Sequence, residues 1–207
     1  MSEMLVTFIL ASALLSLAPG PDNLFVLTMS AVHGPRPGIM VTLGLCTGLV
    51  LHTLAAAIGI AAIFQTYDWA YQVLKLVGAG YLLYLAWVAL NTAASEKSFA
   101  ETPGVSLPKL YRRGFIMNIT NPKVSIFFLA FLPQFASAEQ GAMMPQMLLL
   151  GAIFIMVAMV VFSSLALFAG VIGKQIREST NLQNILHRLA AMVFIGLASK
   201  LIFEEML

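Results

Sequence analysis

"LSLAPGPDNLFVLTMSA", residues 15–31, interrupts an apolar run that begins at Met4. Two prolines, a glycine, an aspartate and an asparagine fall near the middle of this run, within residues 18–23. Proline lacks a backbone N–H and clashes with the preceding helical turn, so a helix that enters this stretch must break. Broken backbone persists in lipid only where protein or a watery cavity satisfies its polar groups. The stretch therefore predicts a broken membrane helix whose break faces a polar interior.

The composition is that of an integral membrane protein. Of the 207 residues, 60% are hydrophobic and only 10% are charged, whereas soluble domains are about 45–50% apolar and about 25% charged. The expected surroundings are the lipid bilayer, and a net charge of +2 without any basic run argues against a nucleic-acid partner. The single cysteine, Cys46, excludes an intramolecular disulfide and the chemistry of cysteine pairs.

Six segments reach the length of about 20 mostly apolar residues that a membrane span needs, or come close to it. They are residues 4–32, 38–64, 70–91, 114–135, 147–172 and 189–203. The first is expected to be a retained span, because no Lys or Arg precedes it as in a signal peptide. The first and the fourth contain breaks. The sequence thus predicts an all-α fold with six transmembrane helices, of which helices one and four are broken near the midplane.

Basic residues predict the orientation of these spans. Eight of the eleven Lys and Arg residues fall in loops that share one side: Arg36, Lys97, Lys109, Arg112, Arg113, Lys174, Arg177 and Arg188. Because cytoplasmic loops carry the excess of Lys and Arg, both termini are expected outside. The longest loop, residues 92–113, is expected to be a cytoplasmic linker.

This linker divides a single transmembrane domain, residues 1–207, into two halves of three spans. Repeat one covers residues 1–91 and repeat two covers 114–207. Three is an odd number, so the second half must insert upside down relative to the first. Inverted repeats with broken helices at matching positions are typical of secondary transporters and point to a site at the midplane. The alternative is two unrelated proline kinks.

The first break has a defined chemistry. Pro19, Gly20 and Pro21 free several backbone groups at once, and Pro21 suits the first position of a new helix. Asp22 and Asn23 then fall in the first turn of that helix, where the helix dipole favours negative charge.

The second break carries the opposite charge. Asn121 can cap a new helix that starts at Pro122, and Lys123 then needs an anionic partner because it lies at the positive end of the dipole. Ionisable groups within a membrane are normally paired and functional. We expect Asp22 and Lys123 to face one cavity that binds a zwitterion. The alternative is a structural ion pair that locks span one to span four.

Other polar or small residues within spans are open to two interpretations. His52, near the centre of span two, fits either a proton relay or a neutral histidine bonded to a neighbouring helix. Lys75, in span three, is expected to extend its amine to the outer interface rather than to the site. Gly44 and Gly48 form a small-xxx-small pattern that allows close helix contact, within the chain or between two subunits of a homodimer.

Four motifs together resemble the LysE/RhtB family of bacterial amino-acid exporters. They are "APGPDNLFVL" at 18–27, "GLCTGLVLHTLAAAIGI" at 44–60, "LKLVGAGYLLYLAW" at 74–87 and "FIMNITNPKVSIFFLAFLPQF" at 115–135. The resemblance implies export of amino acids across the inner (cytoplasmic) membrane, with the proton gradient rather than a cofactor as the energy source. It marks the residues of both breaks as the site, with His52, Lys75 and Gly78 as weaker members.

The resemblance implies either basic amino acids or small neutral ones such as threonine, homoserine or leucine as substrates. The single membrane carboxylate favours the neutral ones, because a basic amino acid brings a second cation. Basic amino acids, or another small solute or metal ion, remain the alternative. A metal exporter would want several carboxylates or a Cys/His cluster, and a membrane thiol oxidoreductase would want a second cysteine besides Cys46. A membrane scaffold without transport activity is a further alternative, but it gives no reason for buried charges beside broken helices. No enzymatic activity is expected.

Overall fold

The computed structural model describes residues 2–66, 68–91, 106–137, 141–178 and 180–203. Within these ranges every regular element is helical. Two helical stretches, Pro35–Gly59 and Met143–Ala169, are long and apolar enough to cross a membrane, and two bent helix pairs also qualify if each pair is one span. The apolar stretch Lys75–Asn91 is shorter. The structure is that of an all-α membrane protein with two to four such spans among the described residues, and the total of six stays a prediction.

The first bent pair confirms the predicted break. Helix α1 (Ser2–Leu17) and helix α2 (Pro21–His33) meet at an angle of 62°. Pro21 occupies the start of α2, where its missing N–H leaves no helical bond unmade. Gly34 follows α2 with a φ of 86°, a left-handed conformation that suits glycine, and turns the chain into α3.

The second bent pair joins α5 (Leu107–Ile119) to the stretch Pro122–Phe135, which begins with α6 (Pro122–Ile126), at 50°. A π-helix, η1 (Phe127–Phe131), and a 3-10 turn, η2 (Leu132–Phe135), continue α6. Helix α5 begins at Leu107, ahead of the predicted start of the fourth span and inside the predicted linker, of which residues 92–105 lie outside the described part of the chain.

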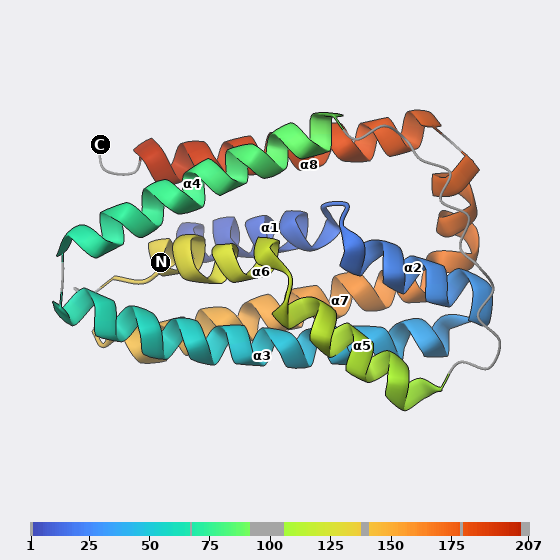
Figure 1. Ribbon diagram of the computed structural model, residues 1–207, viewed down its shortest axis with the longest axis horizontal. Helices are drawn as coiled ribbons and strands as arrows, with labels where there is room; N and C mark the ends of the chain where they lie inside the picture. The colour runs from blue at the N-terminus through green and yellow to red at the C-terminus, as the bar shows by residue number, and fades with distance from the viewer. Residues whose placement is uncertain (1, 67, 92–105, 138–140, 179, 204–207) are drawn as a thin grey trace.

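The four remaining helices are long and continuous. They are α3 (Pro35–Thr66), α4 (Asp68–Asn91), α7 (Met143–Glu178) and α8 (Thr180–Phe203). Helix α3 packs against α5 and α7, α7 packs against α1 and α2, and α4 packs against α8. Each helix from the first half runs opposite to its counterpart in the second half: α3 opposes α7, α4 opposes α8, and the α1–α2 pair opposes the α5–α6 pair (Figure 1). Both breaks lie near the mid-length of the molecule.

Small residues bring α3 and α5 together. A β-carbon on Gly44 would collide with the Tyr111 carbonyl of α5, and one on Gly114 of α5 would collide with the α3 backbone. A β-carbon on Gly48 would stand 2.6 Å from Asn118 Oδ1. Close approach of this kind is what small-xxx-small patterns allow. The Gly44–Gly48 pattern therefore serves a contact inside the chain.

An aromatic cluster fills the interior on one side of the breaks. Its six phenylalanines come from α1, η1, η2 and α7, and each is at most 3% exposed: Phe8, Phe127, Phe128, Phe131, Phe135 and Phe154. Neighbouring ring centroids lie 4.9–6.0 Å apart. The rings tie both broken helices to α7, so they hold the two breaks at a fixed depth.

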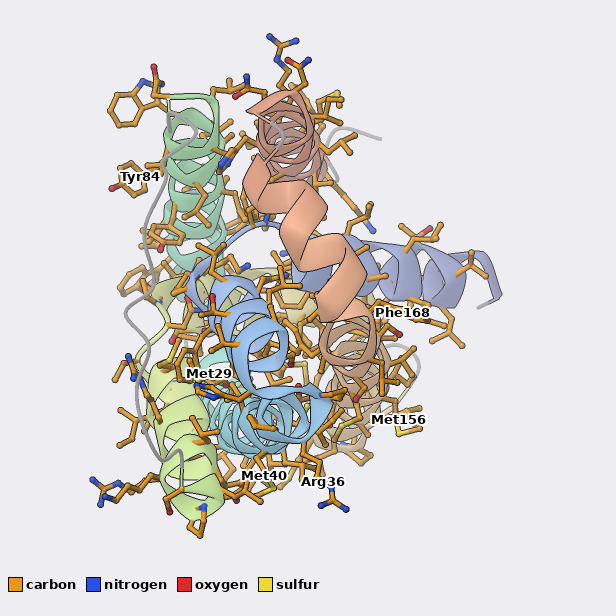
Figure 2. All side chains as sticks on the ribbon, turned by 90° about the vertical axis from the view of Figure 1, so that its right-hand side faces the viewer. Met29, Arg36, Met40, Tyr84, Met156 and Phe168 are labelled. Atoms are coloured by element: carbon orange, nitrogen blue, oxygen red, sulfur yellow. The ribbon has the colours of Figure 1, made fainter. Side chains whose placement is uncertain are left out.

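The outer surface is apolar on several flanks. Figure 2 shows Tyr84 of α4 and Met156 and Phe168 of α7 pointing away from the body of the protein, and their side chains are 54–67% exposed. Exposed apolar side chains on separate faces of a soluble protein would be unfavourable in water. They agree with a protein surrounded by lipid.

Candidate functional site: the junction of two broken helices

The first break leaves carbonyls at the end of α1 without helical donors. Pro19 has no N–H, so the Leu15 carbonyl lacks its partner four residues on. Lys123 of the second break supplies a donor, because its Nζ lies 3.3 Å from the Leu15 oxygen and 3.2 Å from the Ala18 oxygen. Asn23 Nδ2 donates to the Ser16 oxygen at 2.7 Å. The end of α1 is thus capped by two side chains from outside that helix.

Gly20 makes room for the lysine amine. A β-carbon at Gly20 would stand 3.3 Å from Lys123 Nζ. Gly20 also caps α2 and has an extended backbone, but it has no side chain to bond the first amides of that helix. The positive end of the α2 dipole therefore lies next to the lysine amine and is not neutralised by a capping side chain.

The second break is completed by side chains from α6 and α3. Asn121 Oδ1 accepts from the Lys123 amide at 3.0 Å, which confirms the predicted cap of α6. Pro122 frees the Asn118 carbonyl, and this oxygen accepts from the Asn121 amide at 3.0 Å. It also lies 3.1 Å from His52 Nε2 of α3. Because a carbonyl only accepts, Nε2 carries a proton in this arrangement.

Asp22 links the two breaks. Its carboxylate is 3% exposed, and Oδ2 accepts from Asn121 Nδ2 at 2.9 Å. Among the described residues no ion pair joins Asp22 to Lys123. Each charge is instead held by the opposite break: Asp22 by an amide of the second, Lys123 by carbonyls of the first. Both breaks therefore depend on each other for their polar partners.

Several buried oxygens at this junction lack a donor. Asp22 Oδ1, Asn23 Oδ1, Ser16 Oγ and Asn118 Oδ1 have no hydrogen-bond partner. A buried polar atom without a partner carries a desolvation penalty of about 1–3 kcal/mol. Groups of this kind in a native fold call for a ligand or a bound water to complete them.

The structure brings together the predicted residues of both breaks. Those residues are Pro19, Gly20, Pro21, Asp22, Asn23, Asn121, Pro122 and Lys123. His52 joins them through the Asn118 carbonyl, as a histidine bonded to a neighbouring helix. Gly78 packs against Ala130 of η1, away from these contacts.

One sequence prediction needs correction. Lys75 does not extend its amine to an interface, because its side chain is 4% exposed and lies within the protein. The Asn118 carbonyl is the group that Pro122 frees, and the side-chain oxygen of Asn118 has no hydrogen-bond partner. The sequence predicted freed carbonyls at the first break, but not that Lys123 donates to the Leu15 and Ala18 oxygens, because the donor depends on how the helices pack.

A buried carboxylate and a half-buried lysine at the junction of two broken helices, inside an apolar helical protein, are what a membrane translocator requires. The family model described as "LysE type translocator" matches residues 13–205. The chain belongs to this family, and the resemblance that the four motifs carry is confirmed.

Curated relatives cover most of the chain. A homoserine/homoserine lactone efflux protein of Salmonella typhimurium (strain LT2) is 36% identical over 165 residues, 78% of each chain. A leucine efflux protein of Enterobacter sp. (strain 638) is 25% identical over 196 residues, 94% of this chain and 93% of the relative. An uncharacterized membrane protein of Vibrio cholerae is 28% identical over 191 residues, 92% of each. No solved structure matches the chain.

Proposed function

We propose that this protein exports small neutral amino acids across the bacterial inner membrane as a proton-coupled secondary transporter. The observation that carries the proposal is the junction itself, where a buried carboxylate with one unpartnered oxygen and a lysine amine lie on opposite broken helices. Efflux of homoserine and leucine by relatives supports the substrate class.

A zwitterion fits the charges at the junction. Asp22 uses one carboxylate oxygen for Asn121 and keeps the other for a substrate ammonium. Lys123 has three N–H donors and uses two of them for carbonyls, so one is left for a substrate carboxylate. The α2 N-terminus beside Gly20 adds the positive end of a helix dipole. A basic amino acid would add a cation for which Asp22 leaves no second counter-charge.

Export against a gradient needs an energy source. One charge that moves through the membrane potential releases about 2.3 kcal/mol per 100 mV. The entry of one proton in exchange for one neutral zwitterion supplies this energy, and no cofactor is required. Asp22 and His52 are the candidate carriers of that proton, since both lie at the junction.

The predicted topology accounts for the antiparallel halves. Six spans in two inverted repeats, with both termini outside, would make each helix of repeat one oppose its counterpart, and the observed helix directions support this (Figure 1). The α3–α5 contact has its counterpart in the contact of α7 with α1 and α2. Inverted halves give a transporter two alternative ways to pack around one central site.

Uptake of labelled amino acids into inside-out vesicles tests the function. Vesicles that contain the protein should accumulate at least one neutral amino acid when a proton gradient is imposed, and should lose this accumulation when the gradient is collapsed. Vesicles without the protein are the control. Equal uptake by both vesicle types for every amino acid would reject the proposal.

A further inference from the structure

The oxygens that lack a donor are concentrated at the first break. Ser16 Oγ, Asp22 Oδ1 and Asn23 Oδ1 have no hydrogen-bond partner, and their side chains are 3–5% exposed. Ser16 lies in the last turn of α1, and the other two lie in the first turn of α2. The 2.7 Å bond from Asn23 Nδ2 to the Ser16 carbonyl brings the two sides of the break into contact. Three buried acceptors therefore surround one interruption of the chain.

Ser16 differs from the other buried serine of its helix. Ser12, one turn earlier, donates its hydroxyl to the Phe8 carbonyl at 2.7 Å, which is the usual way in which a helical serine satisfies its side chain. Ser16 is also buried, with 5% of its surface exposed, and makes no such bond. Its hydroxyl oxygen is thus available to a ligand, and nothing in the fold of α1 accounts for a serine at this position.

We propose that Ser16 Oγ, Asp22 Oδ1 and Asn23 Oδ1 form the subsite that binds the primary ammonium of the exported amino acid. This inference rests on the proposed function and adds Ser16 as a specificity-determining residue. A primary ammonium has three N–H donors and no acceptor, and the subsite offers three oxygens and one negative charge. Substrates must then keep a free ammonium, while the carboxyl group is recognised elsewhere, by Lys123.

An alkali cation fits these oxygens less well. Such an ion in a broken helix is usually coordinated by the carbonyls that the break frees. Here the Leu15 and Ala18 carbonyls are bonded to Lys123, and the Ser16 carbonyl is bonded to Asn23. The lysine amine already occupies the position of a cation at the end of α1. The three remaining oxygens match the donors of one ammonium.

The chemical test uses L-leucine or L-homoserine, whichever wild-type vesicles take up, with its methyl ester and its N-acetyl derivative as unlabelled competitors. The ester keeps the ammonium and loses the carboxylate, and the N-acetyl derivative does the reverse. We expect the ester to compete with the labelled amino acid and the N-acetyl derivative to be at least tenfold weaker than the ester. Equal competition by both derivatives would overturn the inference.

The genetic test compares Ser16→Ala with the matched control Ser12→Ala. Loss of one hydrogen bond to a charged group weakens binding about tenfold or more, so Ser16→Ala should raise the KM by that factor while Ser12→Ala stays within twofold of wild type. The melting temperature of unliganded Ser16→Ala should not fall below that of wild type, since the removed hydroxyl has no partner. If Ser16 has only a structural role, the KM of Ser16→Ala should stay close to that of wild type and its melting temperature should fall.

Two further outcomes would contradict the subsite. If sodium alone protects the wild-type protein, but not Ser16→Ala, against thermal unfolding, the three oxygens bind an alkali cation instead of an ammonium. An unchanged KM in Ser16→Ala, with the variant folded, would exclude the serine. A wild-type protein that takes up no amino acid at all would instead reject the proposed function, and the subsite with it.

Discussion

At the scale of single residues, the junction of the two breaks explains how Asp22 and Lys123 are stabilised inside an apolar protein. Asp22 and Lys123 are not held by each other but by amide and carbonyl groups of the opposite break. A buried charge is stable only when hydrogen bonds and a counter-charge replace its water shell. The two residues therefore stabilise both breaks and still keep one acceptor and one donor for a substrate.

Removal of the lysine amine should destabilise the fold. Lys123→Met keeps the length of the side chain, leaves two carbonyls without donors and leaves Asp22 without a nearby cation. A buried carbonyl that is left without a donor costs about 1–3 kcal/mol, so the melting temperature of the purified variant should fall. The double variant Asp22→Asn, Lys123→Met should recover part of this loss because no buried charge remains. A double variant no more stable than Lys123→Met would show that the two charges do not interact.

The sequence predicted the identity of these residues but not their partners. Prolines beside a carboxylate and a lysine inside apolar runs are visible in the sequence, because each is unfavourable in lipid without a partner. The carbonyls of Leu15, Ala18 and Asn118 are backbone groups, and which side chain reaches them depends on how the helices pack. Lys75 was misplaced for the same reason: its position in a span does not reveal which face is covered.

At the scale of helices, the crossing of α3 and α5 positions the second break. Gly44 and Gly48 of α3 and Gly114 of α5 let the two backbones approach closely. His52, one turn beyond Gly48, then reaches the Asn118 carbonyl. The glycines of α3 thus allow the close helix contact that places His52 against the second break.

A β-carbon at this crossing should separate the helices. In Gly48→Ala the added carbon would contact Asn118 at distances of 2.6–2.9 Å. Overpacking of this kind costs about 1–3 kcal/mol, and transport should fall because the His52 contact is displaced. Gly59→Ala on the same helix is the control: a β-carbon there meets nothing within 4 Å, so stability should be unchanged or higher by up to about 1 kcal/mol. Thermal unfolding and vesicle uptake measure both effects, and equal behaviour of the two variants would contradict the role of this crossing.

Helix identity was predictable because proline breaks and apolar runs are local signals. The residues at which the helices begin and end were less predictable from the sequence. Helix α5 begins at Leu107, inside the predicted loop. The sequence did not reveal this, because the basic residues that indicated a loop can equally lie along an exposed face of a helix. The π-helix at Phe127–Phe131 has no sequence signal of its own, because its extra residue per turn is stabilised by the packing of the aromatic cluster.

At the scale of the whole molecule, two halves of unrelated sequence run in opposite directions and meet at their breaks (Figure 1). The pattern of spans and basic loops predicts an inverted repeat, which these helix directions support and which stays a prediction. The total of six spans stays a prediction, because the apolar stretch of α4 among the described residues, Lys75–Asn91, is short and α8 is not one of the spanning stretches.

The orientation of the halves makes a testable prediction. Because basic residues cluster in the loops assigned to the cytoplasm, alkaline phosphatase fused to the C-terminus should be active, and green fluorescent protein fused there should not fluoresce. A fusion within the 92–105 linker should give the opposite pair of results. A fluorescent C-terminal fusion would contradict six spans with both termini outside.

The most direct measurement is gradient-driven uptake by vesicles that contain equal amounts of wild-type or Asp22→Asn protein. The asparagine retains an oxygen for the bond from Asn121, so the fold should survive, and immunoblotting and size-exclusion chromatography check the amount and the folding. Within the described part of the chain, it removes the only negative charge available to a substrate ammonium at this junction. We expect wild-type vesicles to accumulate a neutral amino acid and Asp22→Asn vesicles to accumulate none above background. Undiminished uptake by the folded variant would contradict the claim that the junction of the two breaks is the transport site.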